Sequence, residues 1–467
     1  MPQDMPAADQ SDAAQIGQHL AALCDWAANV SCTDIPAEIT ARAAVVLCDD
    51  IAAIVAARNE PEVVKLQGRL MSRGGVKEAT VFNGAVDKSD RFSSAVANAA
   101  AADWCELDEG YRRATCHAGL YTIPALIAEA EASGVSTRSM LRSLVLGYEI
   151  VARFARTFPP RSLVLHPHAS LAAVGAAAAV GSVRRLDART LLAAVASAST
   201  MVAPGPYRHA VEGALVRNVW PAAGAWCGMQ AVEWAECGIG GTPQSPFDVF
   251  ATAFGHRVLP DQLTEGLGQD WALSDGYHKI HACCQYSHST VEAILELRTE
   301  LGDRMQRTRR IVVETHPLGM TLDNRHPETS LAAKFSLPHI AAAACLHGHA
   351  GADAFASADL HAPALAALRA MVELVPFVPL QPWPNDRPAR VRIVLEDGSE
   401  HVRECQSACG GPDRPFEPAT IVQKIDGIME QLFPAAPGVM QRLMANDAAT
   451  LDASWRAVVA ELTARAV

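Results

Sequence analysis

The sequence is short of three things: long hydrophobic runs, positive charge, and the common motifs for nucleotide binding or a serine nucleophile. Its longest low-polarity stretch, residues 171–183, is too short and too rich in alanine and glycine to span a membrane. The formal net charge of −12 argues against nucleic acid or an anionic membrane as the main partner. There is no Gly-x4-Gly-Lys-Ser/Thr loop, no Gly-x-Gly-x-x-Gly after a predicted strand and no Gly-x-Ser-x-Gly elbow. We therefore expect neither a membrane protein nor a nucleic-acid-binding protein.

Cysteine is present, but not in the pattern of a disulfide framework. The 12 cysteines are spread along a long chain. The first fifteen residues, MPQDMPAADQSDAAQ, have neither the basic nor the apolar region of a secretory signal. We therefore expect reduced thiols and a cytoplasmic location.

The composition is that of a globular protein with many helices. Half of the 467 residues are hydrophobic and 19% are charged, and the length suggests two or three domains. Apolar residues recur at three- and four-residue steps, which predicts helices, in residues 11–30, 34–58, 136–156 and 186–200. These segments are rich in alanine and glycine, whose small side chains let helices approach closely. A compact multi-helix domain is therefore expected in the first two-thirds of the chain.

The pattern changes near residue 305, where β-branched residues become frequent. Residues 308–317, TRRIVVETHP, predict a strand. Residues 389–404 contain two strand-like halves around Asp397-Gly398, which is the strongest hairpin signal in the chain.

Between these strands, residues 327–348 predict one long helix that ends at Gly348. The proline-rich residues 375–388 predict an irregular connection. Helical patterns return after about residue 412. The predicted order is a large helical domain, an inserted α+β domain over roughly residues 270–410, and a helical tail.

Residues 276–290, GYHKIHACCQYSHST, concentrate histidine, cysteine and lysine. A structural zinc site usually needs paired ligand spacings, whereas Cys283 and Cys284 are adjacent and point apart in a helix or strand. A disulfide between adjacent cysteines is strained. The stretch is then either a buried helix start with incidental histidines or one wall of an acid/base site. In the second case a lysine would hold a carboxylate and histidines would move protons. The residues concerned are Lys279, His281 and His288.

A second polar group, residues 103–117, lies between two apolar segments that are expected to be buried helices. A dense acidic run is usually a solvated loop, but one held between core helices is a good place for a site. Carboxylate and histidine together can take a proton from beside a carboxylate and protonate a leaving hydroxyl. The polar residues of this loop are Asp103, Glu106, Asp108, Glu109, Arg112, Arg113 and His117.

Two further segments carry isolated polar residues. His166 and His168 precede an alanine-rich helix, whose N-terminus favours anions, although a polar cap before a buried helix is an equally good interpretation. Arg217 stands in an apolar segment. A buried arginine needs an anionic partner, either a structural carboxylate or a substrate.

Taken in order, these segments resemble the MmgE/PrpD family, which contains dehydratases, decarboxylases and epimerases of di- and tricarboxylates. The resemblance covers most of the chain and depends on the order and spacing of the segments rather than on any single motif. The segments are LCDWAANVSCTDIPAEITARAAVVLCDDIAA, ELDEG…CHAG, LHPHASLAAVGAAAA, EGALVRNVWPAAGAWCGMQAVEWAECGIGG, HKIHACCQYSHSTVEAILEL and AAKFSLPHIAAAACLHG.

The resemblance implies a mainly α fold. A large all-helical domain would be built from both chain ends, residues 1–268 and 413–467, and residues 269–412 would form a smaller inserted α+β lid domain. The resemblance also implies a homodimer and a small carboxylate substrate in the cleft between domain and lid. The implied acid/base chemistry uses no metal and no cofactor.

The resemblance also implies roles for individual residues. His117 is the expected general acid/base, with Asp108 or Glu106 orienting it, and His166 is the expected second proton carrier. Lys279, which opens the lid motif, joins this catalytic group. The residues expected to contact the substrate are Arg217, Arg112, His288, His339 and His281.

Three positions depart from the family pattern. Arg217 stands where the well-known lyases have a lysine, and arginine favours bidentate contacts. His339 stands where they often have a tyrosine. The acidic loop, ELDEGYRR, is about one residue longer than theirs. These changes lie among the expected substrate contacts, so they bear on the identity of the substrate more than on the fold.

The leading hypothesis is a dehydratase-type lyase that removes a proton alpha to a carboxylate and then eliminates water. An isomerase or epimerase that uses the same site is the second hypothesis. A non-catalytic relative that binds a carboxylate or has a structural role is the third, and a zinc hydrolase is the last.

Overall fold

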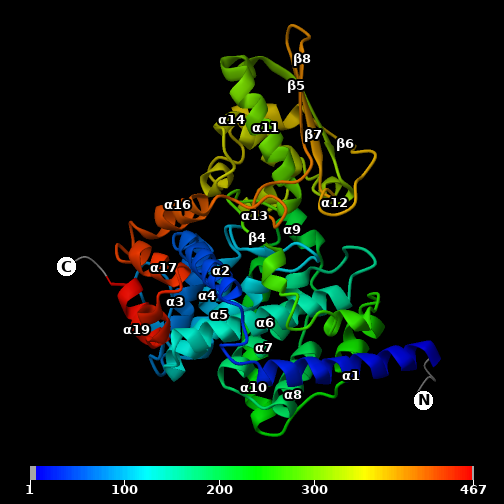
Figure 1. The fold of residues 1–467 in the computed structure, drawn as a ribbon. Coiled ribbons are helices and arrows are strands. Elements are labelled where there is room, and N and C mark those ends of the chain that lie inside the picture. The colour runs from blue at the N-terminus through cyan, green and yellow to red at the C-terminus, as the bar shows by residue number, and fades with distance from the viewer. Residues whose placement is uncertain (1–6, 465–467) are drawn as a thin grey trace.

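The computed structural model describes residues 7–464, and the chain is mainly helical, as predicted. In Figure 1 a large group of helices fills the lower part, and a small sheet with helices beside it forms the upper part. The helices before residue 240 are α1 (Ala7–Asn29), α2 (Ala37–Ala56), α3 (Pro61–Met71), α4 (Arg91–Ala102), α5 (Ala118–Ser133), α6 (Thr137–Thr157), α7 (Pro167–Val183), α8 (Ala188–Thr200), α9 (Arg208–Glu212) and α10 (Trp220–Glu236).

The centre of the helical part is α7, which is buried along its whole length and packs against α5, α6, α8 and α10. Small residues make this packing possible. A Cβ on Gly147 of α6 would lie 2.8 Å from the Cβ of Ala179 in α7, closer than two non-bonded carbons can approach. The alanine and glycine content of these segments therefore reflects close contact between helices.

The last helices of the chain return to the first ones. They are α16 (Pro418–Met429), α17 (Ala436–Met444), α18 (Ala448–Asp452) and α19 (Trp455–Leu462). The α16 and α17 helices pack against α2, and α19 packs against α5 (Figure 1). Trp455 is fully buried, and its indole N–H donates to the carbonyl of Ile127 at 3.2 Å. The two ends of the described chain thus share one apolar core.

The upper part, which we call the sheet-containing part (residues 281–405), has a four-stranded sheet in the order β6-β5-β7-β8. β5 pairs parallel with β6 and antiparallel with β7, and β7 and β8 form an antiparallel hairpin. The strands are β5 (Thr308–Thr315), β6 (Val372–Pro376), β7 (Ala389–Leu395) and β8 (Glu400–Cys405). The helices are α11 (His288–Leu301), α12 (Pro317–Met320), α13 (Ser330–Lys334), α14 (Leu337–His347) and α15 (Pro363–Ala370). The predicted strand and hairpin are confirmed, and Gly398 has the positive φ of 81° that the turn requires.

Two sequence-based predictions are wrong in this part. Residues 327–348 form two helices rather than one, because Ser336 caps a new helix by accepting from the His339 N–H at 3.1 Å, and Pro338 supplies no N–H to continue the preceding turn. The connection expected over residues 375–388 begins with the end of β6, whose pairing with β5 depends on a partner far away in the sequence.

Two short strand pairs complete the fold: β1 (Ala79–Thr80) with β2 (Lys88–Ser89), and β3 (Gly110–Tyr111) with β4 (Gly276–Tyr277). Over residues 7–464, no helix combines the length and the apolar character that crossing a bilayer requires.

Candidate active site

The β3–β4 pair joins two segments that are far apart in the sequence. Gly110 lies opposite Tyr277 in the antiparallel register. A Cβ on Gly110 would overlap the Tyr277 ring, so only glycine allows this approach. The pairing places the acidic loop, residues 103–117, beside the histidine-rich residues 276–290.

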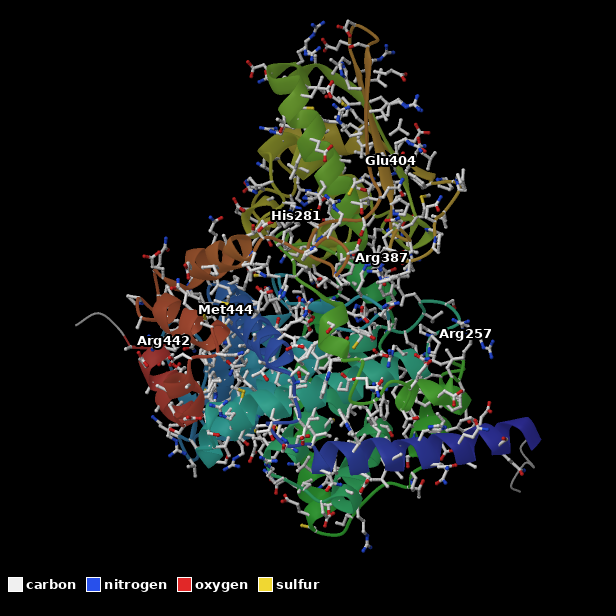
Figure 2. All side chains as sticks on the ribbon, viewed as in Figure 1. Arg257, His281, Arg387, Glu404, Arg442 and Met444 are labelled. Atoms are coloured by element: carbon white, nitrogen blue, oxygen red, sulfur yellow. The ribbon has the colours of Figure 1, made fainter. Side chains whose placement is uncertain are left out.

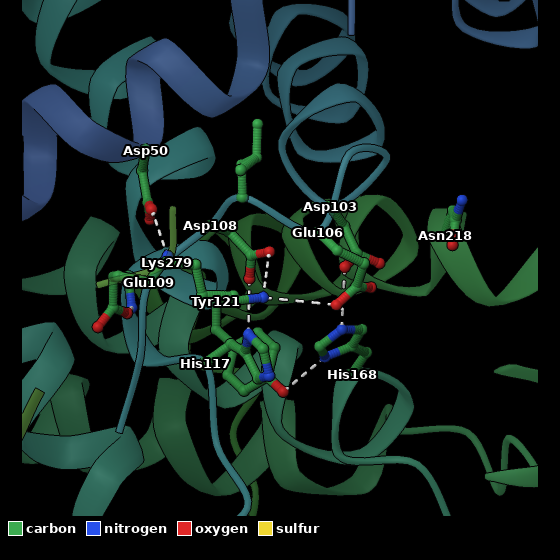
Figure 3. A network of polar contacts seen from close by, with 12 residues as sticks. Asp50, Asp103, Glu106, Asp108, Glu109, His117, Tyr121, His168, Asn218 and Lys279 are labelled. Carbon is green, nitrogen blue, oxygen red and sulfur yellow. Dashed lines mark hydrogen bonds and ion pairs between the residues drawn. The ribbon is translucent and has the colours of Figure 1, made fainter. Parts of the chain in front are cut away.

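His117 and Asp108 form a close pair at the start of α5. Nδ1 of His117 lies 2.6 Å from Oδ2 of Asp108 (Figure 3). Because a carboxylate can only accept, the ring donates from Nδ1–H, which leaves a lone pair on Nε2. Among the residues that the structure describes, Nε2 has no hydrogen-bond partner, and the side chain is 14% exposed. This is the arrangement of a histidine base held in one tautomer by a carboxylate.

The contacts of Asp108 with Lys279 and His117 keep its carboxylate ionised. Burial alone would raise the pKa of Asp108, but Lys279 and His117 outweigh it and hold the pKa well below its usual range. Nζ of Lys279 lies 3.1 Å from Oδ1 of Asp108 and 3.4 Å from Oε2 of Glu106. Burial alone would lower the pKa of Lys279, but Asp108 and Glu106 raise it well above its usual value. Lys279 is therefore an ammonium ion whose charge is matched by carboxylates of the acidic loop.

Arg217 forms the other half of this buried network. Its Nη1 lies 2.8 Å from both oxygens of Asp103 and 2.5 Å from Oε1 of Glu106. Burial opposes the charge on Arg217, but Asp103 and Glu106 raise its pKa above the usual value. Burial raises the pKa of Asp103 to about 6, although the charge of Arg217 acts in the opposite direction. The anionic partner that a buried Arg217 needs is thus supplied by the protein itself.

A chain of hydrogen bonds runs behind His117. The hydroxyl of Tyr121 lies 2.7 Å from Nδ1 of His168, and Nε2 of His168 lies 3.1 Å from Oδ1 of Asp103 (Figure 3). Burial holds the pKa of His168 well below its usual value, so the ring is neutral. Nε2–H then donates to Asp103, and Nδ1 accepts from the tyrosine. The rings of His117 and His168 meet edge to face, with centroids 4.9 Å apart.

His166 lies beside Arg217 at the start of α7. Nε of Arg217 lies 3.2 Å from Nε2 of His166, and the His166 ring stacks on Tyr207 with centroids 5.5 Å apart. Burial lowers the pKa of His166 well below its usual value, and the neighbouring charge of Arg217 adds to this effect. A neutral His166 therefore faces the same space as His117.

That space is a cavity of about 40 Å³. His117, His166, Arg217, Glu106 and Tyr111 line it from the helical part, and Gln285, Tyr286, Phe335 and Arg387 line it from the sheet-containing part. A much larger cavity of about 990 Å³ lies next to it and shares Ala114, Thr115 and Pro167 with it. None of the candidate catalytic residues lines the larger cavity. We therefore place the candidate site at the smaller cavity, which His117, His166 and Arg217 line, and treat the larger cavity as a neighbouring space.

Four of the expected substrate contacts do not line this cavity. Arg112 donates to both oxygens of Asp386, with its Nη2 2.5 Å from Oδ1. Nε2–H of His288 donates to the carbonyl of Cys283 at 3.1 Å. His281 and His339 are buried, and burial lowers the pKa of each to about 4. The structure thus brings together His117, Asp108, Glu106, His166, Lys279 and Arg217, but not these four.

The structure also adds residues that the sequence-based prediction missed. Tyr121 lies one helical turn after His117, so the periodicity of α5 could have indicated that the two share a face. Asp103 and His168 belong to segments already singled out. Arg387 lies in the proline-rich connection, and no local pattern marks it.

A metal site was also considered. Within residues 7–464, the one group of three side chains whose ligand atoms cluster closely enough for a metal ion is Asp103, Glu106 and Asp108, within 4.8 Å of one another. Arg217 and Lys279 contact these three carboxylates, so a divalent cation would have to compete with two positive side chains. Cys283 and Cys284 are free, buried thiols and belong to no such group.

Comparisons with known proteins show to which family the chain is similar. The chain matches the MmgE/PrpD N-terminal domain over residues 21–260 and the MmgE/PrpD C-terminal domain over residues 281–449. It is 26% identical over 461 residues to the cis-aconitate decarboxylase-like protein oryM of Aspergillus oryzae, covering 89% of this chain and 91% of that protein. It is 24% identical over 346 residues to the cis-aconitate decarboxylase of Aspergillus terreus, covering 68% of this chain and 70% of that protein.

Proposed function

Because the chain belongs to the MmgE/PrpD family, we propose that it is a lyase that removes a proton next to a carboxylate of a small di- or tricarboxylate. The observation that carries this proposal is the His117–Asp108 pair, in which Nε2 of a partly buried histidine is left free beside a cavity. Asp108 holds the ring in the tautomer that accepts a proton at Nε2, and it stabilises the imidazolium that then forms.

The charge that develops on the substrate also needs stabilisation. When the C–H bond breaks, its electron pair moves towards the adjacent carboxylate, whose oxygens become more negative. Arg217 lines the cavity with its guanidinium, and Lys279 holds the Asp108 carboxylate behind His117. A fixed cation beside the developing enolate-like charge lowers the barrier.

The second step decides the product. In a dehydration, the electron pair forms a carbon–carbon double bond as the C–O bond breaks, and the hydroxyl leaves as water after receiving a proton. His166 lines the same cavity as His117 and is our proposed proton carrier for this step. We propose dehydration as the outcome. Loss of carbon dioxide is the second candidate, because two of the similar proteins are cis-aconitate decarboxylases by name.

The size of the cavity implies movement. About 40 Å³ is far below the roughly 300–1,000 Å³ of ligand pockets that hold small molecules. Residues from the sheet-containing part form one wall, so we propose that this part moves as a lid when the substrate enters. A homodimer and a cytoplasmic location are also proposals, and light scattering after size-exclusion chromatography tests the first.

Proton NMR in D2O tests the function. The purified protein is mixed with citrate, 2-methylcitrate, cis-aconitate, tartrate-like and iminodisuccinate-like acids. We expect deuterium at a carbon alpha to a carboxylate, together with a new alkene signal. An inverted centre without an alkene would identify an epimerase. No exchange with any acid, while one of them still raises Tm, would identify a binding protein and contradict the proposal.

A further inference from the structure

Two arginines line the catalytic cavity, and they differ in their partners. Arg217 has Asp103 and Glu106 within hydrogen-bond distance. Arg387 is buried, with 8% of the residue exposed, and donates to a neutral acceptor, the side-chain oxygen of Gln285. Its Nε is buried without a hydrogen bond, and within residues 7–464 its Nη2 has no acceptor either. Nε and Nη2 together form one edge of the guanidinium, which is an edge that binds a carboxylate with two parallel hydrogen bonds.

The neighbouring carboxylate does not satisfy Arg387. Nε of Arg387 lies 3.7 Å from Oδ2 of Asp386, beyond hydrogen-bond distance. Both oxygens of Asp386 already accept from Arg112, whose guanidinium is also buried. Asp413 attracts Arg112 from beyond ion-pair distance. At close range, one aspartate therefore serves two arginines, so these three side chains carry one net positive charge.

Contacts with Ser289 and Tyr286 hold Arg387 in place. The hydroxyl of Ser289 donates to the Arg387 carbonyl at 2.7 Å, and the guanidinium lies 5.0 Å from the centre of the Tyr286 ring. Figure 2 labels Arg387 where the sheet-containing part meets the helical part. His117 and Arg217 line the cavity from the helical part, so Arg387 faces the proposed catalytic residues from the other part.

We propose that Arg387 binds a second carboxylate of the substrate, one that does not react, through its free Nε–Nη2 edge. The inference deepens the proposed function, because it takes the substrate to be a carboxylate and specifies that it carries at least two such groups. A carboxylate at Arg387 supplies a second negative charge beside the two arginines that share Asp386. It also links the two parts of the protein when the cavity is occupied, because Arg387 comes from the sheet-containing part.

The test uses binding rather than turnover, so that it does not depend on the reaction. The probe is tricarballylate, a saturated tricarboxylate with no leaving group, and isothermal titration calorimetry measures its Kd. We expect Arg387→Gln to weaken binding about 30-fold or more, since a charged partner in a buried site is lost. Arg387→Lys keeps the charge but not the planar edge and should give an intermediate loss.

The matched control is Arg392→Gln. Arg392 lies in β7 of the same part and pairs with Glu400 at 3.0 Å, with 41% of its side chain exposed. The Arg392→Gln variant removes the same charge from a residue that does not line the cavity, and it should leave the Kd within about 2-fold of the wild type. A monoamide of tricarballylate lacks one negative charge, so the wild type should bind it more weakly than tricarballylate. The wild type and Arg387→Gln should bind this monoamide with about equal Kd.

The results of this test separate a failure of the Arg387 subsite from a failure of the proposed lyase activity. If tricarballylate binds and Arg387→Gln weakens it while no acid is turned over, the lyase proposal fails and the subsite stands. If Arg387→Gln binds as tightly as the wild type, or if the wild type binds no tricarboxylate, the subsite is wrong even for an active lyase. A Tm that is equal for the Arg387→Gln and wild-type proteins without ligand shows that the variant is folded.

Discussion

The helical part and the sheet-containing part both bury histidines, but they give them different partners. In the helical part, His117 and His168 contact the carboxylates of Asp108 and Asp103 beside the cavity. In the sheet-containing part, His288 and His316 donate to the backbone carbonyls of Cys283 and Tyr286. Asp108 fixes the tautomer of His117 and stabilises its protonated form, whereas burial lowers the pKa of His288 and His316, although each carbonyl acts in the opposite direction. A run of histidines in a sequence therefore does not show which of them can move a proton.

The largest expected effect separates His117 from His281. We expect His117→Gln to lower kcat/KM about 1,000-fold, because the base is removed while most of the ring volume is kept. The matched variant, His281→Gln, should change kcat/KM less than about 3-fold, since His281 does not line the cavity. Steady-state rates on the acid identified by NMR give both numbers, and circular dichroism checks the fold. Equal losses in the two variants would remove the distinction between the two groups of histidines.

A smaller effect concerns two buried lysines. Lys279 contacts two carboxylates, whereas Lys334 of α13 donates to the carbonyl of Trp104 at 2.8 Å. We expect Lys279→Met to lower the free energy of unfolding by roughly 3–5 kcal/mol, because it leaves buried negative charge uncompensated. Lys334→Met, which removes a charge from a neutral partner, should cost no more than about 1–2 kcal/mol. Urea unfolding at pH 7 measures both. A Lys279→Met protein no less stable than Lys334→Met would mean that the acidic loop does not depend on this lysine.

The smallest expected effect is a pH dependence of stability. Burial lowers the pKa of His281 to about 4, below the value of about 6.5 in an unfolded chain. Between these two values the unfolded state binds the proton and the folded state does not. The contribution of His281 to the free energy of unfolding therefore falls as the pH falls from about 6.5 to about 4. The slope is at most about 1.4 kcal/mol per pH unit. Across this window, the urea midpoint of unfolding should depend less steeply on pH in His281→Gln than in the wild type. An unchanged slope would show that His281 is not buried in its neutral form.

The features that the sequence predicted correctly are those with a local cause. The strand at residues 308–317 and the hairpin around Gly398 follow from β-branched runs and from a short turn with glycine at its positive-φ position. The acidic loop and His117 were recognisable because charge interrupts two apolar segments. Where a local signal competed with another one, the prediction failed: Ser336 and Pro338 start a new helix inside an apolar pattern that otherwise reads as continuous.

The site itself depends on contacts that have no local cause. Lys279 and Asp108 are 171 residues apart, and Arg217 and Asp103 are 114 apart. The resemblance placed Lys279, Arg217 and His166 near the substrate, and the structure shows what each one contacts. It also directs Arg112 to Asp386 and gives the free guanidinium edge to Arg387 instead. No periodicity distinguishes these two arginines, because the difference between them is which carboxylate the folded chain brings within reach.

The sequence alone determined the helical class, three of the four strands of the sheet, the acidic loop and the family, because periodicity, turn chemistry or the order of motifs indicates each of them. The tertiary structure alone decided which histidine contacts both a carboxylate and a cavity, and which arginine has a guanidinium edge without a hydrogen bond. Those properties are differences in burial and in distance between side chains, and they exist only once the chain has folded.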